Sequence, residues 1–308
     1  MAIKTATVTV NGQVVSLTLN ESTGKYEAKL TAPADSSFNL PGGYFPANVK
    51  GVDTAGNEIT ADSTHSTFGT FLRVFVEEEV KPTIVILAPS SGAYVTTGTP
   101  EIKFKVLDNT VQTSGYSGIK KDSCVLKIGS ASIAASAISW ESVEGGFIGT
   151  YTPTEILADG EHTLTIDIKD NDGNSADTAS CTFTVDTVAP SLVITTPEDG
   201  FETNKSELEI VGITDDTTSK PVTIDIKLNG NDCGEVAINP DGSFRKKVTF
   251  TQQGENTIVV TATDRAGKVT TITRKVIFNT IAPVIKSVVI SPNPVKAGAV
   301  YTISVEFE

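Results

Sequence analysis

The sequence has little of the chemistry on which most enzymes and metal centres depend. Its 308 residues include two histidines, three cysteines, one tryptophan and one methionine. Histidine performs much of the general acid–base catalysis in proteins, and no Gly-x-Ser-x-Gly, His-Glu-x-x-His or phosphate-binding loop is present. His65 lies among turn-forming residues and His162 opens a predicted strand, so we interpret both as surface or turn residues. We expect no enzyme activity.

Positive charge is also scarce. The chain has 24 Lys and Arg against 37 Asp and Glu, which gives a formal net charge of −13. Nucleic-acid binders concentrate Lys and Arg against phosphates, so we expect no nucleic-acid partner. No apolar run approaches the roughly 18–20 residues that cross a bilayer, so we expect no membrane insertion. Residues 1–25 also lack a basic segment followed by a continuous apolar stretch, the pattern of a secretory signal.

Alternation of polar and apolar residues is the dominant pattern in the chain. It is clear in Thr5–Val10, Leu164–Ile168 and Ile224–Leu228. A period of two places one face of a strand in a core and the other in water. No stretch of ten or more residues has a convincing helical period. We therefore predict an all-β chain.

Three local patterns recur and indicate repeated modules. X-Pro dipeptides precede strand-like runs at Pro82, Pro190 and Pro283, at intervals close to the roughly 100 residues of one β-sandwich. Asp-led Gly turns, typical of hairpins, occupy Asp53–Asn57, Asp170–Asn174 and Asp264–Lys268. Pro-x-x-Gly turns follow two of the runs, at Pro89–Gly92 and Pro197–Gly200.

These repeats predict four segments. We expect a short β module (first module, 1–80), two sandwiches (second module, 81–187, and third module, 188–281) and a C-terminal β segment (282–308). The last segment holds about two strands, which are marginally stable alone. It is therefore either an incomplete fourth module or a pair of strands that joins a partner. The linkers between modules are short and contain Pro, which predicts an elongated array with limited bending.

Motifs in the second and third modules resemble those of bacterial immunoglobulin-like repeats in surface and virion proteins. The third module is also similar to the sandwich modules of glucodextranase-type enzymes through Thr195–Gly200, Val211–Gly212, Lys227–Gly230, Pro240–Phe244, Gly254–Ile258 and Ala262–Gly267. The second module resembles a sister type through Leu157–Thr163 and Val185–Pro190. The resemblance implies tandem immunoglobulin-like antiparallel β-sandwiches. It says little about function, because one scaffold carries many functions.

A narrower resemblance concerns the whole chain. Met1–Lys4, Pro41–Pro46, Ser291–Val295 and Thr302–Val305 look like segments of Ig-like proteins from tailed phages and prophages of Gram-positive hosts. It implies a non-enzymatic virion protein of a tail or baseplate, present in multiple copies on a symmetric assembly. Its partners would be other virion tail proteins and host surface carbohydrate. Such a protein assembles in the host cytoplasm and needs no secretory signal. The alternative is an adhesive or glycan-binding module set that is secreted or on a bacterial cell surface.

The sharpest metal-site candidate is the acidic turn Asp170–Asn174, with Asp172 within it and Asp177 beyond it. Calcium takes six to eight oxygen ligands of this kind, and the turn resembles Asp-rich loops at the junctions of cadherin-type modules. The sister turns at Asp53 and Asp264 lack the middle carboxylate, and Asx-turn chemistry requires no ion. We therefore expect a hairpin and no cofactor, with calcium as the alternative.

Two other acidic groups, Glu77–Glu79 and Asp215–Asp216, are interpreted as solvated linker and loop charge.

Aromatic residues in Gly- and Ser-rich loops are candidates for ligand binding. Tyr116 lies in a long insertion, Asp108–Lys121, and Tyr44 and Phe45 follow Pro41–Gly43. Each ring could stack on a sugar or plug its own module, and the sequence leaves both interpretations open.

The order Cys124…Trp140…Cys181 is similar to the core of an antibody domain. However, the strand that contains Leu164 should lie between the two cysteines. Two strand spacings are about 9.6 Å, beyond the Cα limit of about 7 Å for a disulfide. We therefore predict buried free thiols.

Overall fold

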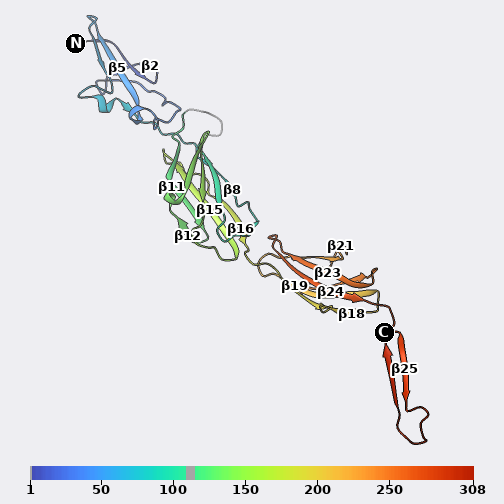
Figure 1. Cartoon of the computed structure of the whole chain (residues 1–308). Coiled ribbons are helices and arrows are strands. Elements are labelled where there is room, and N and C mark those ends of the chain that lie inside the picture. Colours follow the sequence, from blue (N-terminus) through green and yellow to red (C-terminus); the bar gives the residue numbers. More distant parts are fainter. Residues whose placement is uncertain (1, 109–114) are drawn as a thin grey trace. The chain divides into compact units, whose positions relative to one another are not determined.

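The computed structural model describes residues 2–108 and 115–308 (Figure 1). Those residues form β-strands and three short 3-10 helices, with no α-helix among them. No helix in these two ranges has the length and apolar character needed to cross a membrane. The prediction of an all-β chain of tandem antiparallel modules is therefore confirmed. The chain divides into two compact units, residues 1–187 and 188–308, which are described separately.

The first module, in unit 1, is a single antiparallel sheet with a small core. The strands follow the order β2-β1-β5-β6, β7 also pairs with β5, and β3 and β4 form a separate hairpin. Val10, Phe45 and Ala47 are its buried apolar residues. The elements are β1 (Ile3–Val10), β2 (Gln13–Ser16), β3 (Thr18–Asn20), β4 (Lys25–Glu27), η1 (Pro41–Gly43), β5 (Phe45–Asp53), β6 (Glu58–Ala61), η2 (Gly69–Phe71) and β7 (Arg73–Val74).

The second module is a closed two-sheet sandwich. One sheet has the order β13-β14-β10-β8 and the other β12-β11-β15-β16-β9. Alternate residues of both sheets fill the interior, including Phe104, Leu164 and Phe183. The elements are β8 (Thr83–Ala88), β9 (Ala93–Val95), β10 (Ile102–Leu107), β11 (Ile119–Ile128), β12 (Ala131–Ile133), η3 (Ala135–Ala137), β13 (Ser139–Val143), β14 (Gly146–Tyr151), β15 (Gly160–Asp170) and β16 (Ala179–Val185).

The third module, in unit 2, repeats this architecture. Its sheets have the orders β17-β19-β22 and β18-β24-β23-β20-β21. Phe244 is fully buried, and the strand that begins at Gly254 is central in its sheet. The elements are β17 (Ser191–Thr196), β18 (Phe201–Thr203), β19 (Glu207–Asp215), β20 (Thr223–Leu228), β21 (Asn231–Asp232), β22 (Ser243–Thr249), β23 (Gly254–Thr263) and β24 (Val269–Phe278).

The Pro-x-x-Gly turns move the first strand of each sandwich from one sheet to the other. Before the turn, β8 pairs antiparallel with β10; after it, β9 pairs parallel with β16. In unit 2, β17 pairs antiparallel with β19 and β18 parallel with β24. Gly92 and Gly200 adopt φ of 74° and 76°, which glycine accepts without a Cβ clash. One short turn thus lets a single N-terminal run contribute to both layers.

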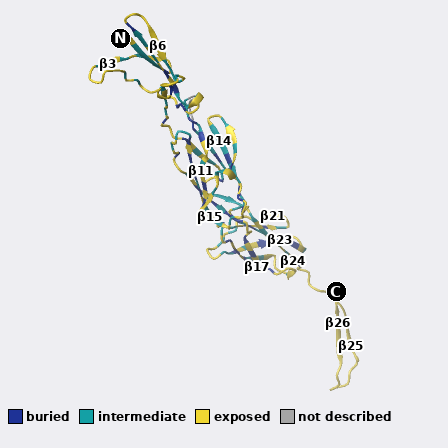
Figure 2. Cartoon of the chain, turned by 90° about the vertical axis from the view of Figure 1, so that its left-hand side faces the viewer, coloured by how far each residue is buried: buried dark blue, intermediate teal, exposed yellow. Residues whose placement is uncertain are grey.

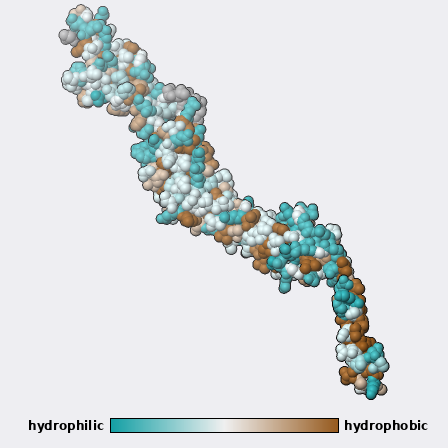
Figure 3. All heavy atoms as spheres, in the orientation of Figure 1, coloured by the Kyte–Doolittle hydropathy of each residue, from teal (hydrophilic) through white to brown (hydrophobic). Residues whose placement is uncertain are grey.

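The C-terminal segment forms a two-stranded hairpin of β25 (Ile285–Ser291) and β26 (Thr302–Phe307). Every residue of both strands is exposed (Figure 2). Apolar side chains lie on its surface (Figure 3). Whether it begins a further module or pairs with a partner stays a prediction.

The three cysteines are free thiols. Cys124 lies on β11 and Cys181 on β16, and β15 runs between these strands. The prediction from strand spacing is therefore confirmed, since the intervening strand keeps the two thiols apart.

Candidate metal centre

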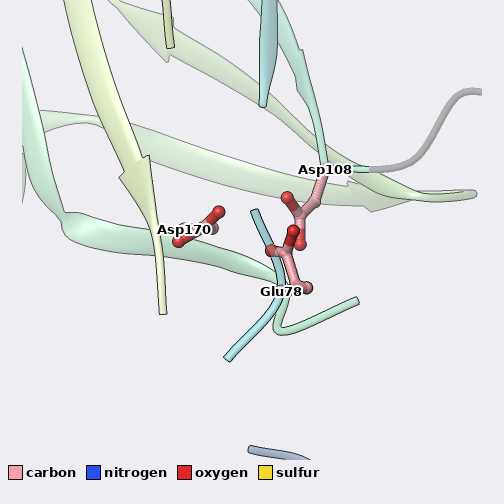
Figure 4. Close-up of side chains that lie close together, drawn as sticks. All are labelled: Glu78, Asp108 and Asp170. Carbon is pink, nitrogen blue, oxygen red and sulfur yellow. The ribbon is translucent and has the colours of Figure 1, made fainter. Parts of the chain in front are cut away.

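Three buried carboxylates meet at one end of the second module (Figure 4). Glu78 lies in the segment that joins the first module to β8, Asp108 follows β10, and Asp170 ends β15. One carboxylate oxygen from each lies within 4.8 Å of the other two. The three residues are 8%, 4% and 0% exposed, in that order. We call Glu78, Asp108 and Asp170 the carboxylate cluster.

Asp170 is held by the Asx turn that its sequence motif predicts. The backbone N–H groups of Gly173 and Asn174 donate to Asp170 Oδ1 at 2.6 and 2.8 Å. Asn174 Nδ2 donates to Asp170 Oδ2 at 2.8 Å. The sister turn has the same bonds, because Asn57 N and Nδ2 donate to the two oxygens of Asp53. The turn therefore explains the position of Asp170 but not its two acidic neighbours.

Glu78 is drawn into the second module by hydrogen bonds to its main chain. Glu78 N donates to Asp172 Oδ2 at 2.9 Å, and Asn174 Nδ2 donates to Glu78 O at 2.8 Å. Its carboxylate accepts from Val80 N and, at 3.4 Å, from Ser117 Oγ. The interpretation of Glu77–Glu79 as solvated linker charge is therefore wrong for Glu78, because these bonds fix its backbone against the hairpin and bury its side chain.

Asp108 has one oxygen that is satisfied and one that is not. Gly118 N donates to Asp108 Oδ2. Asp108 Oδ1 is buried and has no hydrogen-bond partner among the described residues. Buried polar atoms nearly always have a partner, since an unpaired one loses its hydration without compensation. This oxygen is therefore the least satisfied atom of the cluster.

The described residues provide no basic side chain to balance the cluster. Among the described residues, no Lys, Arg or His forms an ion pair with any of its three carboxylates. Burial, and then the neighbouring Asp170 and Asp108, raise the pKa of Glu78 to about 7. Burial and the charges of Asp170 and Asp172 raise the pKa of Asp108. Both shifts have the sign expected when carboxylates lose water and face one another.

The three metal-ligand candidates from the sequence occupy different positions. Asp170 belongs to the cluster. Asp172 is half-buried and accepts the bond from the Glu78 main chain. Asp177 is exposed and pairs with Lys81 at 2.9 Å, outside the cluster. Sequence reasoning missed Glu78 and Asp108. In the sequence, each is only an acidic residue beside a predicted strand or linker, and no neighbouring motif marks it as part of a site.

Unit 2 brings together acids at the corresponding positions of its own sandwich. Asp216 follows β19 as Asp108 follows β10, and Asp216 and Asp264 offer carboxylate oxygens within 4.8 Å of each other. Thr218 N and Ser219 N donate to Asp216 Oδ1 at 2.8 and 2.6 Å. The interpretation of Asp216 as solvated loop charge is therefore wrong, because this turn buries it.

Tyr116 lies where the first and second modules touch. Its carbonyl oxygen accepts from Asn39 Nδ2 at 2.8 Å, and Ser36 N donates to Gly115 O at 2.7 Å. The side chain is half-buried. Residues 109–114 of its insertion lie outside the described residues.

Tyr44 and Phe45 lie in the first module and border an open hollow of about 690 Å³, with Asn48 and Asp62 also on its wall. The Tyr44 ring is half-buried and packs edge-on against Phe75, with the Arg73 guanidinium 4.8 Å from its centre. Phe45 is 6% exposed and belongs to the core of the module. A sugar-stacking role for either ring stays a prediction.

Family models match two segments of the chain. Residues 108–187 match the model described as "Bacterial Ig-like domain". Residues 190–280 match the model described as "Glucodextranase, domain B". Both matches fall on the two-sheet sandwiches, so the resemblance to bacterial Ig-like repeats is confirmed for them.

Among curated proteins, the chain is 33% identical over 141 residues to Bacillopeptidase F of Bacillus subtilis (strain 168). The match covers 46% of this chain and 9% of that protein. Among solved structures, the fibronectin(III)-like modules of Clostridium thermocellum CbhA are 17% identical, with a TM-score of 0.38, over 64% of this chain and 94% of that chain. A tetra-tandem repeat from the extending region of a large adhesion protein is 14% identical, with a TM-score of 0.34. That match covers 98% of this chain and 79% of the other.

Proposed function

We propose that the chain is a non-enzymatic structural protein that positions attachment surfaces, as a component of a phage tail or baseplate that contacts the host envelope. The observation that carries the structural role is the junction between the first and second modules. Main-chain and side-chain groups from both modules hydrogen-bond across it, through Ser36, Asn39, Glu78 and Asn174. A junction of this kind suits a protein that holds two modules in a fixed orientation and passes force between them, and it is not a pocket for a substrate.

The filled interiors of the sandwiches support the same proposal. Large side chains such as Phe104, Phe183 and Phe244 close the cores completely. Enzyme sites need a concave pocket with convergent polar groups. The buried acids of the second module lie in turns and at the junction, where they bond to backbone N–H groups instead of facing a cleft.

A bacterial cell-surface adhesive or glycan-binding module set is the second candidate. The hollow beside Tyr44 favours it, because an aromatic ring with nearby amide and carboxylate groups is suited to a sugar. The match to a bacterial Ig-like domain fits both candidates equally.

A mass-spectrometric inventory of fractions from the source strain tests the proposal. Virions purified from an induced culture and the cell envelopes of an uninduced culture are digested and compared. We expect peptides from both units in the virions, at a constant ratio to the other tail proteins. Peptides found in the envelopes and absent from the virions would overturn the phage assignment and support the adhesive candidate.

A further inference from the structure

The carboxylate cluster has a composition that a hairpin does not require. The sister turn at Asp53 has the same two hydrogen bonds from the following Asn, and among the described residues no group of buried acids includes Asp53. At Asp170 two more carboxylates arrive from separate elements, the inter-module segment and the end of β10. Ionised carboxylates that share a buried site repel one another and lose hydration. A proton on one carboxylate or a bound cation relieves this repulsion.

The unpartnered oxygen of Asp108 points to a ligand. Backbone and side-chain donors reach both oxygens of Asp170, one oxygen of Asp108 and both oxygens of Glu78, one of them only at 3.4 Å. Asp108 Oδ1 receives no hydrogen bond from the described residues, although Asp108 is only 4% exposed. In Figure 4 the Asp108 and Glu78 carboxylates point toward each other, with the Asp170 carboxylate facing them. The site therefore offers acceptors in excess of donors, which is the chemistry that binds a cation.

The donor set selects a hard divalent cation. All three ligands are carboxylates, and Ca²⁺ and Mg²⁺ prefer oxygen over nitrogen or sulfur. Two oxygens bound to one Ca²⁺ at 2.3–2.6 Å lie at most about 5.2 Å apart. The oxygens of the cluster lie no more than 4.8 Å from one another, so all three can contact one Ca²⁺. Calcium is favoured over magnesium because Mg²⁺ keeps several waters and is usually bound by only one or two carboxylates.

We propose that Glu78, Asp108 and Asp170 bind a calcium ion that ties the inter-module segment to the second module. Water completes the coordination of the ion. Because Glu78 comes from the segment that precedes β8 and the two aspartates come from the sandwich, the ion connects parts of the chain that are 30 or more positions apart. Calcium binding therefore stiffens the junction between the first and second modules.

Calcium titration of the full chain, residues 1–308, tests the proposal. The protein is treated with EDTA, dialysed at pH 7.5 and titrated calorimetrically with CaCl₂ and, separately, with MgCl₂. We expect calcium to bind the carboxylate cluster with a dissociation constant of about 10⁻⁴ M or tighter, within the range of Ca²⁺ sites in proteins, and magnesium to bind more weakly. We also expect calcium to raise the thermal midpoint of unit 1, since a ligand that binds only the folded state stabilises it.

Matched variants locate the site. Asp108→Asn removes one charge and keeps the shape, and Asp177→Asn is the control because that carboxylate lies outside the cluster. We expect Asp108→Asn to weaken calcium binding at least about tenfold and to melt at or above the wild-type temperature in EDTA, since it relieves repulsion. We expect Asp177→Asn to bind as the wild type does. If Asp108→Asn fails to fold, Glu78→Gln replaces it in the same design.

Three results would overturn the proposal. One is a wild type that shows neither a heat of binding nor a change in its thermal midpoint up to about 10 mM CaCl₂, a concentration above the dissociation constants of the weakest known calcium sites. Another is unchanged calcium affinity in the cluster variant, or equal loss in the Asp177 control. The third is magnesium binding as tight as that of calcium, which would contradict the choice of ion. These outcomes do not depend on whether the chain belongs to a virion.

Discussion

Gly212 on β19 lies directly opposite Phe244 on β22, and the phenyl ring fills the space that a Cβ atom at Gly212 would need. An ideal Cβ there would lie 2.4 Å from Phe244 Cζ and 2.7 Å from Val193 O. The second module has the same pair in reverse, with Phe104 on β10 opposite Gly149 on β14. Each sandwich thus seats one fully buried phenylalanine over a glycine on the neighbouring strand.

We predict that Gly212→Ala destabilises the third module by about 1–3 kcal/mol, because an overpacked core forces the ring or the strand to move. Urea unfolding followed by circular dichroism measures the change. Gly51→Ala is the control, since its Cβ would meet only Ile59 Cγ2, at 3.4 Å. The double variant Gly212→Ala/Phe244→Leu should show favourable coupling, since the smaller side chain makes room. Equal stability of Gly212→Ala and the wild type would contradict the pairing.

The Asp53 turn should make stability depend on pH. Hydrogen bonds from the Asn57 side chain, and then from its main chain, lower the pKa of Asp53 below its usual value near 3.8. Because the folded pKa is depressed, the stabilising effect is complete above the usual pKa and is lost as the pH falls through the folded value. We therefore expect Asp53→Asn to lower stability at pH 7, with the difference from the wild type shrinking as the pH falls below 3.8. Urea titrations at neutral and at acidic pH provide the measurement, and a difference that persists or widens in acid would refute the assignment.

The thiols should react in an order set by burial. Burial, and then the charge of Asp167, raise the pKa of Cys124 to about 12. Cys181 is also buried, whereas Cys233 is half-exposed. In the native chain at pH 8, we expect iodoacetamide to modify Cys233 before the two buried thiols. We expect Cys124 to react on the order of 10³-fold more slowly than a free thiol, because only the thiolate reacts. Peptide mass spectrometry over time measures this, and all three should react equally in urea. Fast native labelling of Cys124 would show that β11 is not packed as described.

The C-terminal hairpin should contribute nothing to the stability of the third module. All residues of β25 and β26 are exposed, and the two strands pair only with each other. We expect deletion of residues 282–308 to change the thermal midpoint of the third module by less than about 2 °C. Amides of the hairpin should exchange faster than those of β23, because a two-stranded ribbon opens easily. A large drop in the midpoint, or protection equal to that of β23, would show that the hairpin packs on the module.

Local patterns predicted much of the fold because strand alternation and turn chemistry are encoded within a few residues. The turn Asp264–Lys268 was predicted to form a hairpin, and the strands on either side of it, β23 and β24, pair antiparallel along their whole length. The Pro-x-x-Gly turns were visible as turns, but their role in moving a strand between sheets was not. That role depends on which distant strands, β10 and β16, accept the two halves.

The candidate site was predictable only in part. Asp170 was found because its turn is local, whereas Glu78 and Asp108 stand 92 and 62 positions before it in the sequence. No short motif connects residues at such separations. The burial of Glu78 is decided by its main-chain bonds to Asp172 and Asn174, which form only when the linker lies against the hairpin.

By itself, the sequence determined the all-β class, the hairpin turns and the inward face of each strand, because period-two alternation and glycine turns act over neighbouring residues. Tertiary structure decided which acids become buried and which stay in water. Glu77, Glu78 and Glu79 are chemically alike in the sequence, yet only Glu78 is buried. The fold places that one carboxylate beside Asp108 and Asp170, where the loss of solvent raises the free energy of the charged forms.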